Sequence, residues 1–584
     1  MKILGWENSE VTQNLRKQID DLVLEAMDGS IPQLLFSGYM AFVEKGSRRE
    51  SESAYFERRK QLAAFCLYLQ YHKSTESNYK RALNYFEELL WAVINEFTWC
   101  VMAHLPQDKN KFLEKPETQI DLFAAETGET LAEILKLHSN ILPPFLVNTI
   151  RHRISERIFE PFLTKSWWWE TVQSNWCAVC CGSVGMAALL LTEGEFQDKL
   201  LHKVDRGLAN YLNSFGPDGA CEEGIGYWVY GFGYYIYYIA LRKEIDPEYR
   251  QQEEEIIKIK KISEFPRLVQ MSEKSFVPFS DVAAKNFLPT GLLSCLRQEY
   301  GVETPACSHI TPFDFDNGYR FAHISRNLWW TDKEIFTTRL LEEATYLPDR
   351  QWLLQRSKGN FFAVKGGNNR EQHNHNDVGS FVLAINGEQY LADFGAGCYT
   401  ADYFGEKRYE FIQTRSRYHN LPVVNGREQL AGMGECRVEQ VAAGIAFSEI
   451  SMELGTLYGL PEVKSFKRRL ASDLAKDCIV LQDTVCANEE IVIEEGFVSF
   501  LEPRLAREGE ILLEGREAIV TLSYESTLLD YSLEKLSFEN HFGEQVTAYR
   551  IGLKQKVKKR ETDIRLLFRF IFVSPRTKTK TQLI

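Results

Sequence analysis

The spacing of apolar residues changes near residue 346, and this change constrains the fold more than any single motif does. Before it, apolar residues recur three and four positions apart, which is the period of a helix with one buried face. One such stripe consists of Tyr79, Ala82, Leu83, Phe86, Leu89, Leu90 and Val93. Other stripes lie at 131–138 and 146–158, with prolines between them, and further helices are expected over 178–191, 200–212 and 227–241. Many helices joined by short breaks indicate stacked helical hairpins.

After residue 346 the pattern is one of short runs rich in Val, Ile, Phe and Tyr, separated by Gly, Asn and Asp. The runs are FFAVKGG, SFVLAING, EQYLADFG, LPVVNG, GIAFSEI, DCIVLQDTV, EIVIEEGFV, AIVTLSY and LLFRFIFV. Their spacing is typical of an antiparallel sandwich, and the pairs Asn386-Gly387 and Asn425-Gly426 favour hairpin turns. We therefore expect a helical domain over 1–340, with a connecting segment from about 301, and a β-sandwich domain over 341–584.

Size and charge narrow the classes of function. A chain of 584 residues is too long for one hydrophobic core, so two or three domains are expected. Its 44% hydrophobic and 26% charged residues are ordinary for a globular protein. A formal net charge of -13 argues against nonspecific nucleic-acid binding, which depends on clustered Lys and Arg. An anionic substrate stays possible, because a local basic groove can override the global sign. Nucleic acid is therefore not an expected partner.

Targeting signals and membrane segments are not evident. The opening MKILGWENSEVTQNLRKQ lacks the apolar core of a secretory signal, which predicts a cytoplasmic chain, with a secreted or periplasmic one as the alternative if the N-terminus has been trimmed. The 12 cysteines are scattered and do not form a small-scaffold disulfide pattern. The most apolar stretch, GYWVYGFGYYIYYIAL at 226–241, is too short and too rich in Tyr and Gly to span a bilayer. It is interpreted as a buried or groove-lining helix, with no membrane partner.

The stretch REQHNHNDVGSF at 370–381 concentrates polar side chains in one turn. If its backbone is extended, His373 and His375 point to the same side, so that one imidazole could bind a metal and the other act as a base. A zinc site needs further ligands, and Asp393 in YLADFGAG and His419 in SRYHNLPVVNG are the candidates. The alternative is a solvated polar loop, because Asn, Asp and Gly are ordinary turn residues.

Several ordered motifs resemble the heparinase II/III family of polysaccharide lyases. They are IDLFAAETGETLAEIL, PPFLVNTIRHRISERIFEPFL, SNWCAVCCGSVGMAALLL, PDGACEEGIGYWVYGFGYY, HNHNDVGSF, LADFGAG and RSRYHNLPVVNG. The resemblance covers most of the chain up to about residue 426. It implies an incomplete (α/α) toroid followed by an antiparallel β-sandwich, with an active cleft between them, and cleavage of uronate-containing chains by β-elimination.

The resemblance also implies roles for three residues. Asn175 in SNW matches the asparagine that neutralises the uronate carboxylate, although by itself this residue could equally cap the following helix. Tyr227 matches the tyrosine that protonates the departing glycosidic oxygen and can also act as a base. His373 matches the catalytic histidine, the second proton carrier.

The remaining ligand-type residues match a metal site found in some family members. His375, Asp393 and His419 are the implied ligands, and zinc is the expected metal. Its expected role is mainly structural, fixing the loop so that His373 faces the sugar, and a Lewis-acid role is the sharper alternative. The asparagines and Asp377 are then interpreted as turn residues. No organic cofactor is expected.

Other side chains are candidates for substrate contacts. Trp169, within a run of three tryptophans, could stack on a sugar or pack in the core, and His104 could line a subsite or simply be satisfied at a helix end. Glu223, beside Glu222, could tune Tyr227 or favour a helix N-terminus. Among the basic residues near this stretch, Arg415 is the candidate for binding the substrate. The others are Lys365, Arg370, Arg408 and Arg417, and the alternative for each of these side chains is a solvated surface position.

The expected function is a lyase acting on an acidic polysaccharide or oligosaccharide, with a glycosaminoglycan such as heparan, chondroitin or hyaluronan favoured. An alginate or other polyuronate lyase is one alternative. A toroid-type glycoside hydrolase, using Glu222 or Glu223, and an inactive acidic-glycan-binding protein are others. The letters HNH also suggest a nuclease, but that motif spreads over a hairpin and helix, whereas these residues are contiguous.

Overall fold

The computed structural model describes residues 10–105, 115–283, 286–555 and 564–573. The chain divides into two compact units. The first, here called the helical unit, comprises Met1–Gly216, Tyr227–Ser263 and Phe287–Thr338. The second, the β unit, comprises Pro217–Gly226, Glu264–Asn286 and Arg339–Ile584. One division therefore falls beside the boundary expected at residue 340, while two earlier segments also belong to the β unit, which the sequence did not suggest.

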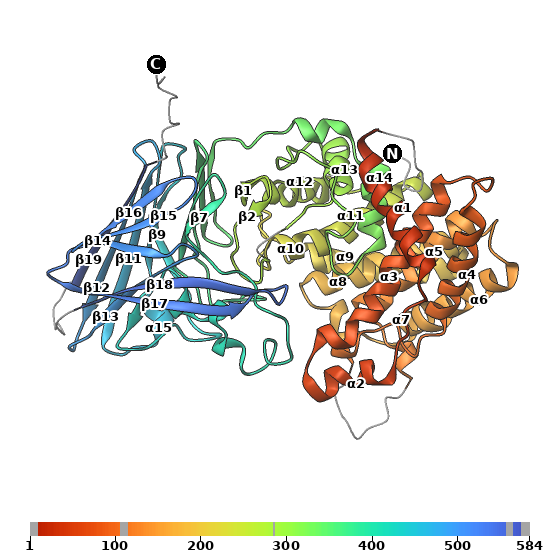
Figure 1. The fold of residues 1–584 in the computed structure, drawn as a ribbon, viewed down its shortest axis with the longest axis horizontal. Coiled ribbons are helices and arrows are strands. Elements are labelled where there is room, and N and C mark those ends of the chain that lie inside the picture. Colours follow the sequence, from red (N-terminus) through yellow and green to blue (C-terminus); the bar gives the residue numbers. More distant parts are fainter. Residues whose placement is uncertain (1–9, 106–114, 284–285, 556–563, 574–584) are drawn as a thin grey trace, which may run out of the picture. The chain divides into compact units, whose positions relative to one another are not determined.

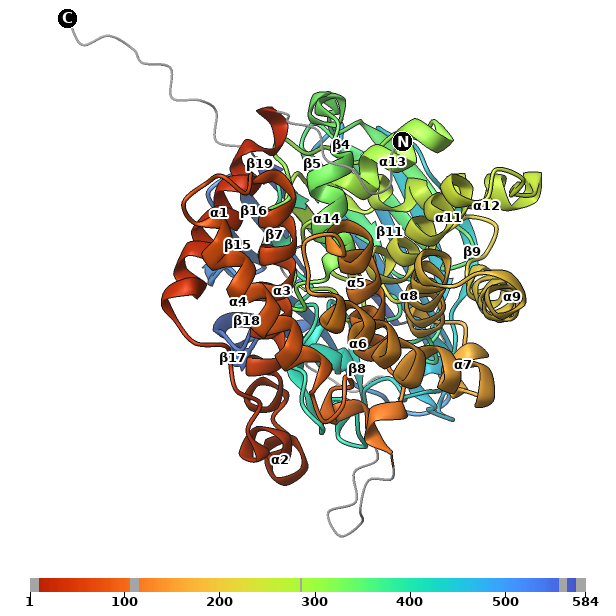
Figure 2. The ribbon, with the colours of Figure 1, turned by 90° about the vertical axis from the view of Figure 1, so that its right-hand side faces the viewer.

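The helical unit is built from successive helices, as the apolar periodicity predicted (Figures 1 and 2). Its first helices are α1 (Gln13–Asp28), α2 (Phe36–Lys45), α3 (Arg48–Tyr71), α4 (Tyr79–Ile94), α5 (Leu122–His138), α6 (Pro144–Ile154) and α7 (Glu160–Thr164). The later helices are α8 (Asn175–Leu191), α9 (Gly194–Leu212), α11 (Gly233–Ile245), α13 (Thr290–Tyr300) and α14 (Phe321–Trp330). The short α10 (Ile225–Tyr227) and α12 (Glu253–Leu268) cross the division between units.

Helix α8 lies at the centre of the helical unit, where it packs against α5, α9 and α11. Nearly all of its side chains are buried, and small residues allow the close approach: a Cβ on Gly182 would lie 2.9 Å from the backbone oxygen of Tyr234 in α11. The aromatic stretch at 226–241 is a buried helical segment, as expected, and it contains a π-helical turn over Trp228–Phe232. The segment expected to be a connection from about 301 instead contains α14, which packs on α13, α3 and α5.

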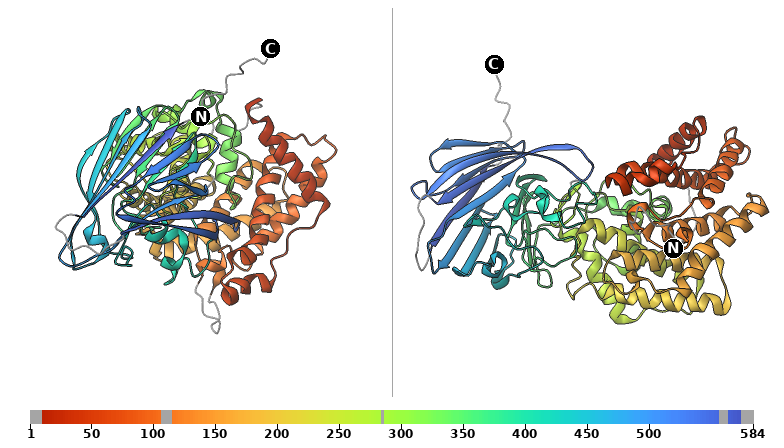
Figure 3. Two further views of the ribbon diagram at one scale, coloured as in Figure 1. Left: turned by 60° about the vertical axis from the view of Figure 1, so that its left-hand side comes forward. Right: turned by 90° about the horizontal axis from the view of Figure 1, so that it is seen from below.

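The β unit contains antiparallel sheets, as expected (Figure 3). A five-stranded sheet runs β3 (Glu343–Leu347), β4 (Trp352–Ser357), β5 (Asn360–Val364), β6 (Phe381–Ile385) and β7 (Glu388–Leu391). An eight-stranded sheet has the order β14 (Pro503–Arg507), β15 (Glu510–Glu514), β16 (Ile519–Ser523), β19 (Ile564–Val573), β12 (Cys478–Ala487), β11 (Val463–Asp473), β10 (Phe447–Glu453) and β9 (Arg437–Ala442). A four-stranded sheet has the order β17 (Leu529–Glu539), β18 (Gln545–Gln555), β13 (Ile493–Ser499) and β8 (Val423–Val424).

All nine predicted strand runs correspond to strands, and one large apolar core is shared by side chains of the three sheets. The Asn386-Gly387 pair joins β6 to β7 with φ of 47° and 84°, the positive angles that a tight hairpin turn requires. A small ribbon, β1 (Gln270–Ser272) with β2 (Ser275–Phe276), precedes the loop that carries Asp281, and α15 (Gly455–Tyr458) follows β10. None of the helices in the described part of the chain is long and apolar enough to span a membrane.

Candidate active and metal site

The HNHND segment is a loop between two paired strands of the five-stranded sheet. Strands β5 and β6 continue their pairing through Lys365, whose amide donates to the Ser380 carbonyl at 2.9 Å and whose carbonyl accepts from the Gly379 amide at 2.7 Å. Beyond that point the chain leaves the sheet. The expected extended backbone is wrong, because His373 has a φ of 55° and the segment forms turns. The two histidines nevertheless face one common group.

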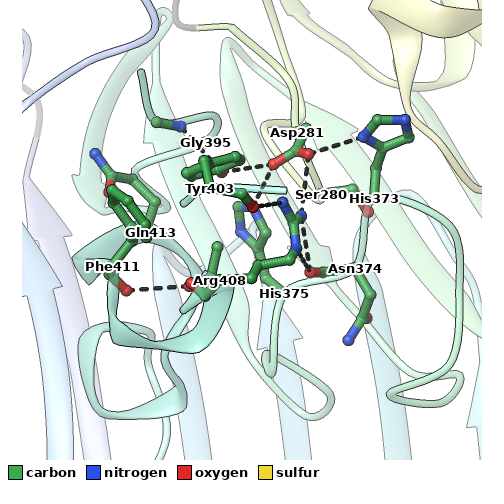
Figure 4. A network of polar contacts seen from close by, with 12 residues as sticks. Ser280, Asp281, His373, Asn374, His375, Gly395, Tyr403, Arg408, Phe411 and Gln413 are labelled. Atoms are coloured by element: carbon green, nitrogen blue, oxygen red, sulfur yellow. Dashed lines mark hydrogen bonds and ion pairs between the residues drawn. The ribbon is translucent and has the colours of Figure 1, made fainter. Parts of the chain in front are cut away.

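That group is the carboxylate of Asp281, in the loop after β2 (Figure 4). His373 Nδ1 lies 2.9 Å from Asp281 Oδ2, and His375 Nε2 lies 3.0 Å from Oδ1. The Tyr403 hydroxyl donates to Oδ1 at 2.7 Å and an Arg408 amine donates to Oδ2 at 3.0 Å. Burial alone would raise the pKa of Asp281, but the hydrogen bonds from both histidines and the Arg408 charge hold it well below its usual range. Asp281 is therefore a fully buried, four-fold hydrogen-bonded carboxylate.

The position of Asp281 depends on a close backbone approach. The chain beside it is fixed because the Ala396 amide donates to the Val282 carbonyl at 2.9 Å. A Cβ on Gly395 would lie only 2.2 Å from that carbonyl oxygen, and Gly395 has a φ of 60°. Glycine is therefore required at this point of the LADFGAG motif. Its role is to let the Asp281 loop dock on the segment after β7.

Arg408 fixes the backbone between the two histidines. Its Nε and one amine donate to the Asn374 carbonyl at 3.2 and 3.0 Å, and the same amine reaches Asp281. The guanidinium also lies over the Tyr403 ring, 4.8 Å from its centre. Arg408 was considered above as a solvated base, but it is buried against this network and its charge balances that of Asp281. The loop is thus held through both its side chains and its main chain.

His375 and His419 present nitrogens to a shared buried space. The ligand atoms of His375, Asp377 and His419 lie within 4.8 Å of one another, and all three side chains are fully buried. Among the described residues, His375 Nδ1 and Asp377 Oδ2 have no hydrogen-bond partner. His375 Nε2 is held by Asp281, and His419 Nε2 lies 2.9 Å from the Gln413 carbonyl, so Nδ1 is the atom of each ring that could bind a metal ion.

Asp393, the third ligand expected from the sequence, is not part of this close group, but its Oδ2 lies 3.2 Å from His419 Nδ1. If His419 is neutral and donates through Nε2, its Nδ1 lone pair faces a carboxylate oxygen, and the contact then needs either a proton on Nδ1 or a metal ion bound by both atoms. Burial would lower the pKa of His419, but Asp393 raises it above the ordinary value. In each of these two imidazoles, Nε2 is hydrogen-bonded to an oxygen, which orients the ring and leaves Nδ1 for a metal. Together with the nearby carboxylates they form a donor set that suits zinc. The described residues therefore fit the expected metal.

Asp377 begins a turn, as the sequence suggested, since its carbonyl accepts from the Ser380 amide at 2.9 Å, but its side chain also forms a buried ion pair. Its Oδ1 lies 2.6 Å from the Lys365 ammonium, and both side chains are fully buried. Burial alone would lower the pKa of Lys365, but Asp377 and Glu371 raise it. The pair places a positive charge beside the group of His375 and His419 and leaves Asp377 Oδ2 directed to that group.

In the helical unit, Asn175 is the first residue inside α8, and Ser174 is the N-cap, which has no side-chain cap hydrogen bond. Asn175 is therefore not the cap of its helix. It is buried and packs on the π-helical turn that begins directly after Tyr227. A Cβ on Gly231 would lie 3.1 Å from that of Asn175, so glycine permits this contact. The structure thus brings Asn175 together with the turn that carries Tyr227.

Tyr227 itself is half-buried, unlike the aromatic residues that follow it. The neighbouring side chains that are buried are Trp228, Tyr230, Phe232, Tyr234, Tyr235, Tyr237 and Tyr238. A core role, the alternative for a tyrosine in so aromatic a helix, therefore does not describe Tyr227. Its ring is partly accessible at the start of a π-helical turn, an irregularity that is frequent at functional sites.

The expectation that Trp169 stacks on a sugar is wrong. Its side chain is fully buried, its indole N–H donates to the Ile120 carbonyl at 3.0 Å, and its ring stacks on Phe162 and Trp167. Of the three consecutive tryptophans at 167–169, the middle one, Trp168, faces outward instead, with 60% of its surface exposed.

Trp168 belongs to an aromatic cluster beside Asn175. Its ring centre lies 4.8 Å from that of Trp176, and His104 lies 4.7 Å from Trp176 on another side. His104 is also hydrogen-bonded, with Nδ1 2.9 Å from Asp121 Oδ2. The cluster of His104, Trp168 and Trp176 is therefore anchored and adjoins the residue expected to bind the uronate carboxylate.

Glu223 and Arg415 have protein partners in the β unit. Glu223 is buried, with one carboxylate oxygen 3.7 Å from His373 Nε2. Arg415 is partly exposed and forms an ion pair with Glu428, while its guanidinium lies 5.3 Å from the Tyr418 ring centre. Glu223 is thus placed to influence His373, and the Arg415 charge is balanced within the protein. Glu222, the other acid of that pair, forms an ion pair with Arg350.

Comparison with known proteins is informative only at the level of structure. No family model matches the chain, and no curated protein matches its sequence. Heparan sulfate lyase HepC from Pedobacter heparinus aligns with a TM-score of 0.64 at 13% identity, covering 98% of this chain and 85% of that chain. A heparinase III structure aligns with a TM-score of 0.66 at 12% identity, covering 100% and 87%. The chain has the fold of polysaccharide lyases.

A chondroitin AC lyase from Streptomyces coelicolor A3 also shares this lyase fold, with a TM-score of 0.59 at 10% identity over 97% of this chain and 81% of that chain. These matches confirm the expected fold class of a helical toroid followed by an antiparallel β-sandwich. Because the identities are low, they establish the fold and leave the choice of substrate to be tested.

Proposed function

We propose that this chain is a polysaccharide lyase that cleaves a uronic-acid-containing glycan by β-elimination and leaves a 4,5-unsaturated sugar at the new non-reducing end. The observation that carries the proposal is the lyase fold shared over nearly the whole chain with heparan and chondroitin lyases. Support comes from Asn175, Tyr227 and His373, which have the residue types that this reaction needs: Asn175 is not the cap of its helix, and Tyr227 and His373 are only half-buried.

The first requirement is to acidify the C5 proton of the uronate. The adjacent carboxylate must be neutralised, since otherwise its negative charge opposes the enolate-like intermediate. The Asn175 amide is the proposed donor, and its place in the first turn of α8 adds the positive end of the helix dipole. The hydrogen bond from the Asn175 amide and the helix dipole both favour binding of an anionic group at the start of α8.

The second requirement is proton transfer on both sides of the scissile bond. His373 donates through Nδ1 to Asp281, so its Nε2 lone pair is the proposed base for the C5 proton. Tyr227 is the proposed acid for the departing glycosidic oxygen, and it can also serve as base for the opposite C5 epimer. Glu223, near His373 Nε2, stabilises the imidazolium that forms.

We further propose that zinc binds His375, Asp393 and His419, with Asp377 as an additional or alternative carboxylate ligand. When bound, zinc supplies a fixed positive charge that ties the HNHND loop to the segments carrying Asp393 and His419. The role of these residues is mainly structural. They hold the loop in the conformation that exposes His373, and no proton-transfer step depends on them.

The proposed substrate is a glycosaminoglycan or an oligosaccharide from one, with alginate or another polyuronate as the alternative. This preference rests on the printed substrates of the similar structures. Trp168 and Trp176 replace Trp169 as the proposed platform for a sugar ring, with His104 at their edge. A glycoside hydrolase is not favoured, because Glu222 is paired with Arg350 and Glu223 is buried.

The test is to incubate the protein with heparan, chondroitin, hyaluronan and alginate fragments and to follow the ultraviolet absorbance of the conjugated product. Tyr227→Phe and His373→Ala should each lower kcat by about 10²–10⁴-fold, the usual contribution of a general acid or base. Tyr249→Phe, at a half-buried position, and His309→Ala, at an exposed one, are the matched controls and should retain activity. Absence of absorbance on every fragment would refute the proposed function.

A further inference from the structure

A single buried carboxylate connects the proposed base with the proposed metal ligand. We propose that Asp281 is a positioning residue that fixes opposite tautomers in His373 and His375 and so couples the metal site to the base. The inference rests on the proposed function for the role of His373. The geometry itself concerns only described residues of the β unit, and Asp281 with its four hydrogen-bond partners is drawn in Figure 4.

The argument begins with the two oxygens of Asp281. Oδ2 faces Nδ1 of His373 at 2.9 Å, whereas Oδ1 faces Nε2 of His375 at 3.0 Å. A carboxylate only accepts, so each facing nitrogen must carry the hydrogen. His373 is therefore protonated at Nδ1, which leaves Nε2, 3.7 Å from a Glu223 oxygen, as the basic nitrogen, and His375 is protonated at Nε2, which leaves Nδ1 for a metal ion. One side chain thus selects the base nitrogen in one ring and the metal-ligand nitrogen in the other.

The remaining contacts make this arrangement rigid. Tyr403 and Arg408 each occupy one further lone pair, so the carboxylate has two donors at each oxygen. Arg408 also binds the Asn374 carbonyl, which lies between the two histidines in the chain. Rotation of Asp281 away from one histidine would break its contacts with the other. A shift at the metal ligand is therefore transmitted to the base through a fully buried group.

The competing interpretation is that Asp281 only neutralises the buried Arg408 charge. In that case its replacement would lower stability, but it would not change the tautomer of either histidine or the affinity for metal. The two interpretations therefore differ in readouts that do not depend on folding stability. Second-sphere partners of metal-bound histidines commonly contribute 10- to 100-fold to metal affinity or activity, which sets the size of the expected effect at roughly that range.

The experiment uses the full-length protein with zinc. In the metal-free wild type, side-chain nitrogen NMR should show His373 protonated at Nδ1 and His375 at Nε2; the opposite tautomer in either ring overturns the proposal. Asp281→Asn should lower zinc affinity by about 10–100-fold and kcat by about the same range, while KM changes little. Asp402→Asn, which changes an exposed aspartate beside Tyr403 in the sequence, is the control and should match wild type in every readout.

Asp281→Asn that binds zinc as tightly as wild type, or that keeps wild-type kcat, would also overturn the proposal. If Asp281→Asn does not fold, the wild-type tautomers still decide it. Loss of the proposed function has a different signature, because the wild-type protein would then give no unsaturated product while the zinc affinity and tautomer results stand unaffected.

Discussion

The buried pair of Lys365 and Asp377 allows a quantitative test of how the site is held. Asp377→Asn keeps the shape of the side chain but leaves the Lys365 ammonium without its partner at 2.6 Å. Removing one member of a buried ion pair costs about 3–5 kcal/mol, because the other charge stays buried. Glu371 and Asp393 also attract Lys365, so we expect the lower end, about 3 kcal/mol. For a unit of this size the entropy of unfolding converts that loss to a fall in Tm of roughly 5 °C.

The assay is thermal and urea unfolding of wild type, Asp377→Asn, Lys365→Met and the double variant in the presence of a chelator. The chelator is needed because bound metal would add its own stabilisation. The double variant should be more stable than the sum of the single effects predicts, with a coupling free energy of about 1–3 kcal/mol. The exposed pair Lys407 and Asp402 is the control, and its substitution should have little effect.

Zinc titrations of the same variants separate the two roles of Asp377. Lys365→Met should keep most of the zinc affinity, whereas Asp377→Asn should lower it if Oδ2 is a ligand. An Asp377→Asn protein within about 0.5 kcal/mol of wild type, or strictly additive effects in the double variant, would refute the reasoning.

Three further predictions concern the helical unit. Burial lowers the pKa of His323 from 6.5 to about 3, so the unfolded chain binds a proton at this residue before the folded chain does. The free energy of unfolding should therefore fall by at most about 5 kcal/mol as the pH drops from about 6.5 to 3. Unfolding of His323→Gln should depend less on pH across that range. Trp169→Ala should cost about 3–5 kcal/mol, whereas Trp168→Ala should leave the Tm unchanged and raise KM; equal Tm values would contradict this. Gly291→Ala should lower stability by about 1–3 kcal/mol, because the new Cβ would lie 2.1 Å from the Arg326 carbonyl oxygen; an unchanged urea midpoint would show that the helices can separate there.

The fold was largely predictable because its signals are local. The stripe of α4 has a helical period, and the apolar runs of strands such as β6 and β19 end at turn residues. Eight strands of the three large sheets were not predicted: β3, β4, β9, β11, β14, β15, β17 and β18. Strand β17, for example, is mostly exposed and its sequence LDYSLEKLSFE is largely polar. Strands β17 and β18 are paired by backbone hydrogen bonds along their full length, and this pairing, rather than apolar composition, stabilises them as strands.

The candidate site was only partly predictable. Residues within recognisable motifs, such as His373 and His375, were found, but Asp281 was missed because the segment VPFSDVAA carries no local signal and its contact with His373 spans 92 residues. Trp169 was misassigned because a run of three tryptophans does not reveal which ring faces the core. The role of Asp281 depends on contacts with residues far away in the sequence, and the role of Trp169 depends on whether its ring is buried. The neighbouring residues in the sequence determine neither.

The central claim, that this chain is a uronate lyase using Tyr227 and His373, is tested most directly by one measurement. Wild type, Tyr227→Phe, His373→Ala and the control Tyr249→Phe are incubated with heparan and chondroitin fragments, and the ultraviolet absorbance of the unsaturated product is recorded with time. The account predicts a steady rise for wild type and for Tyr249→Phe, and a rate at least about a hundredfold lower for each of the other two variants. Full activity in folded Tyr227→Phe and His373→Ala would contradict it.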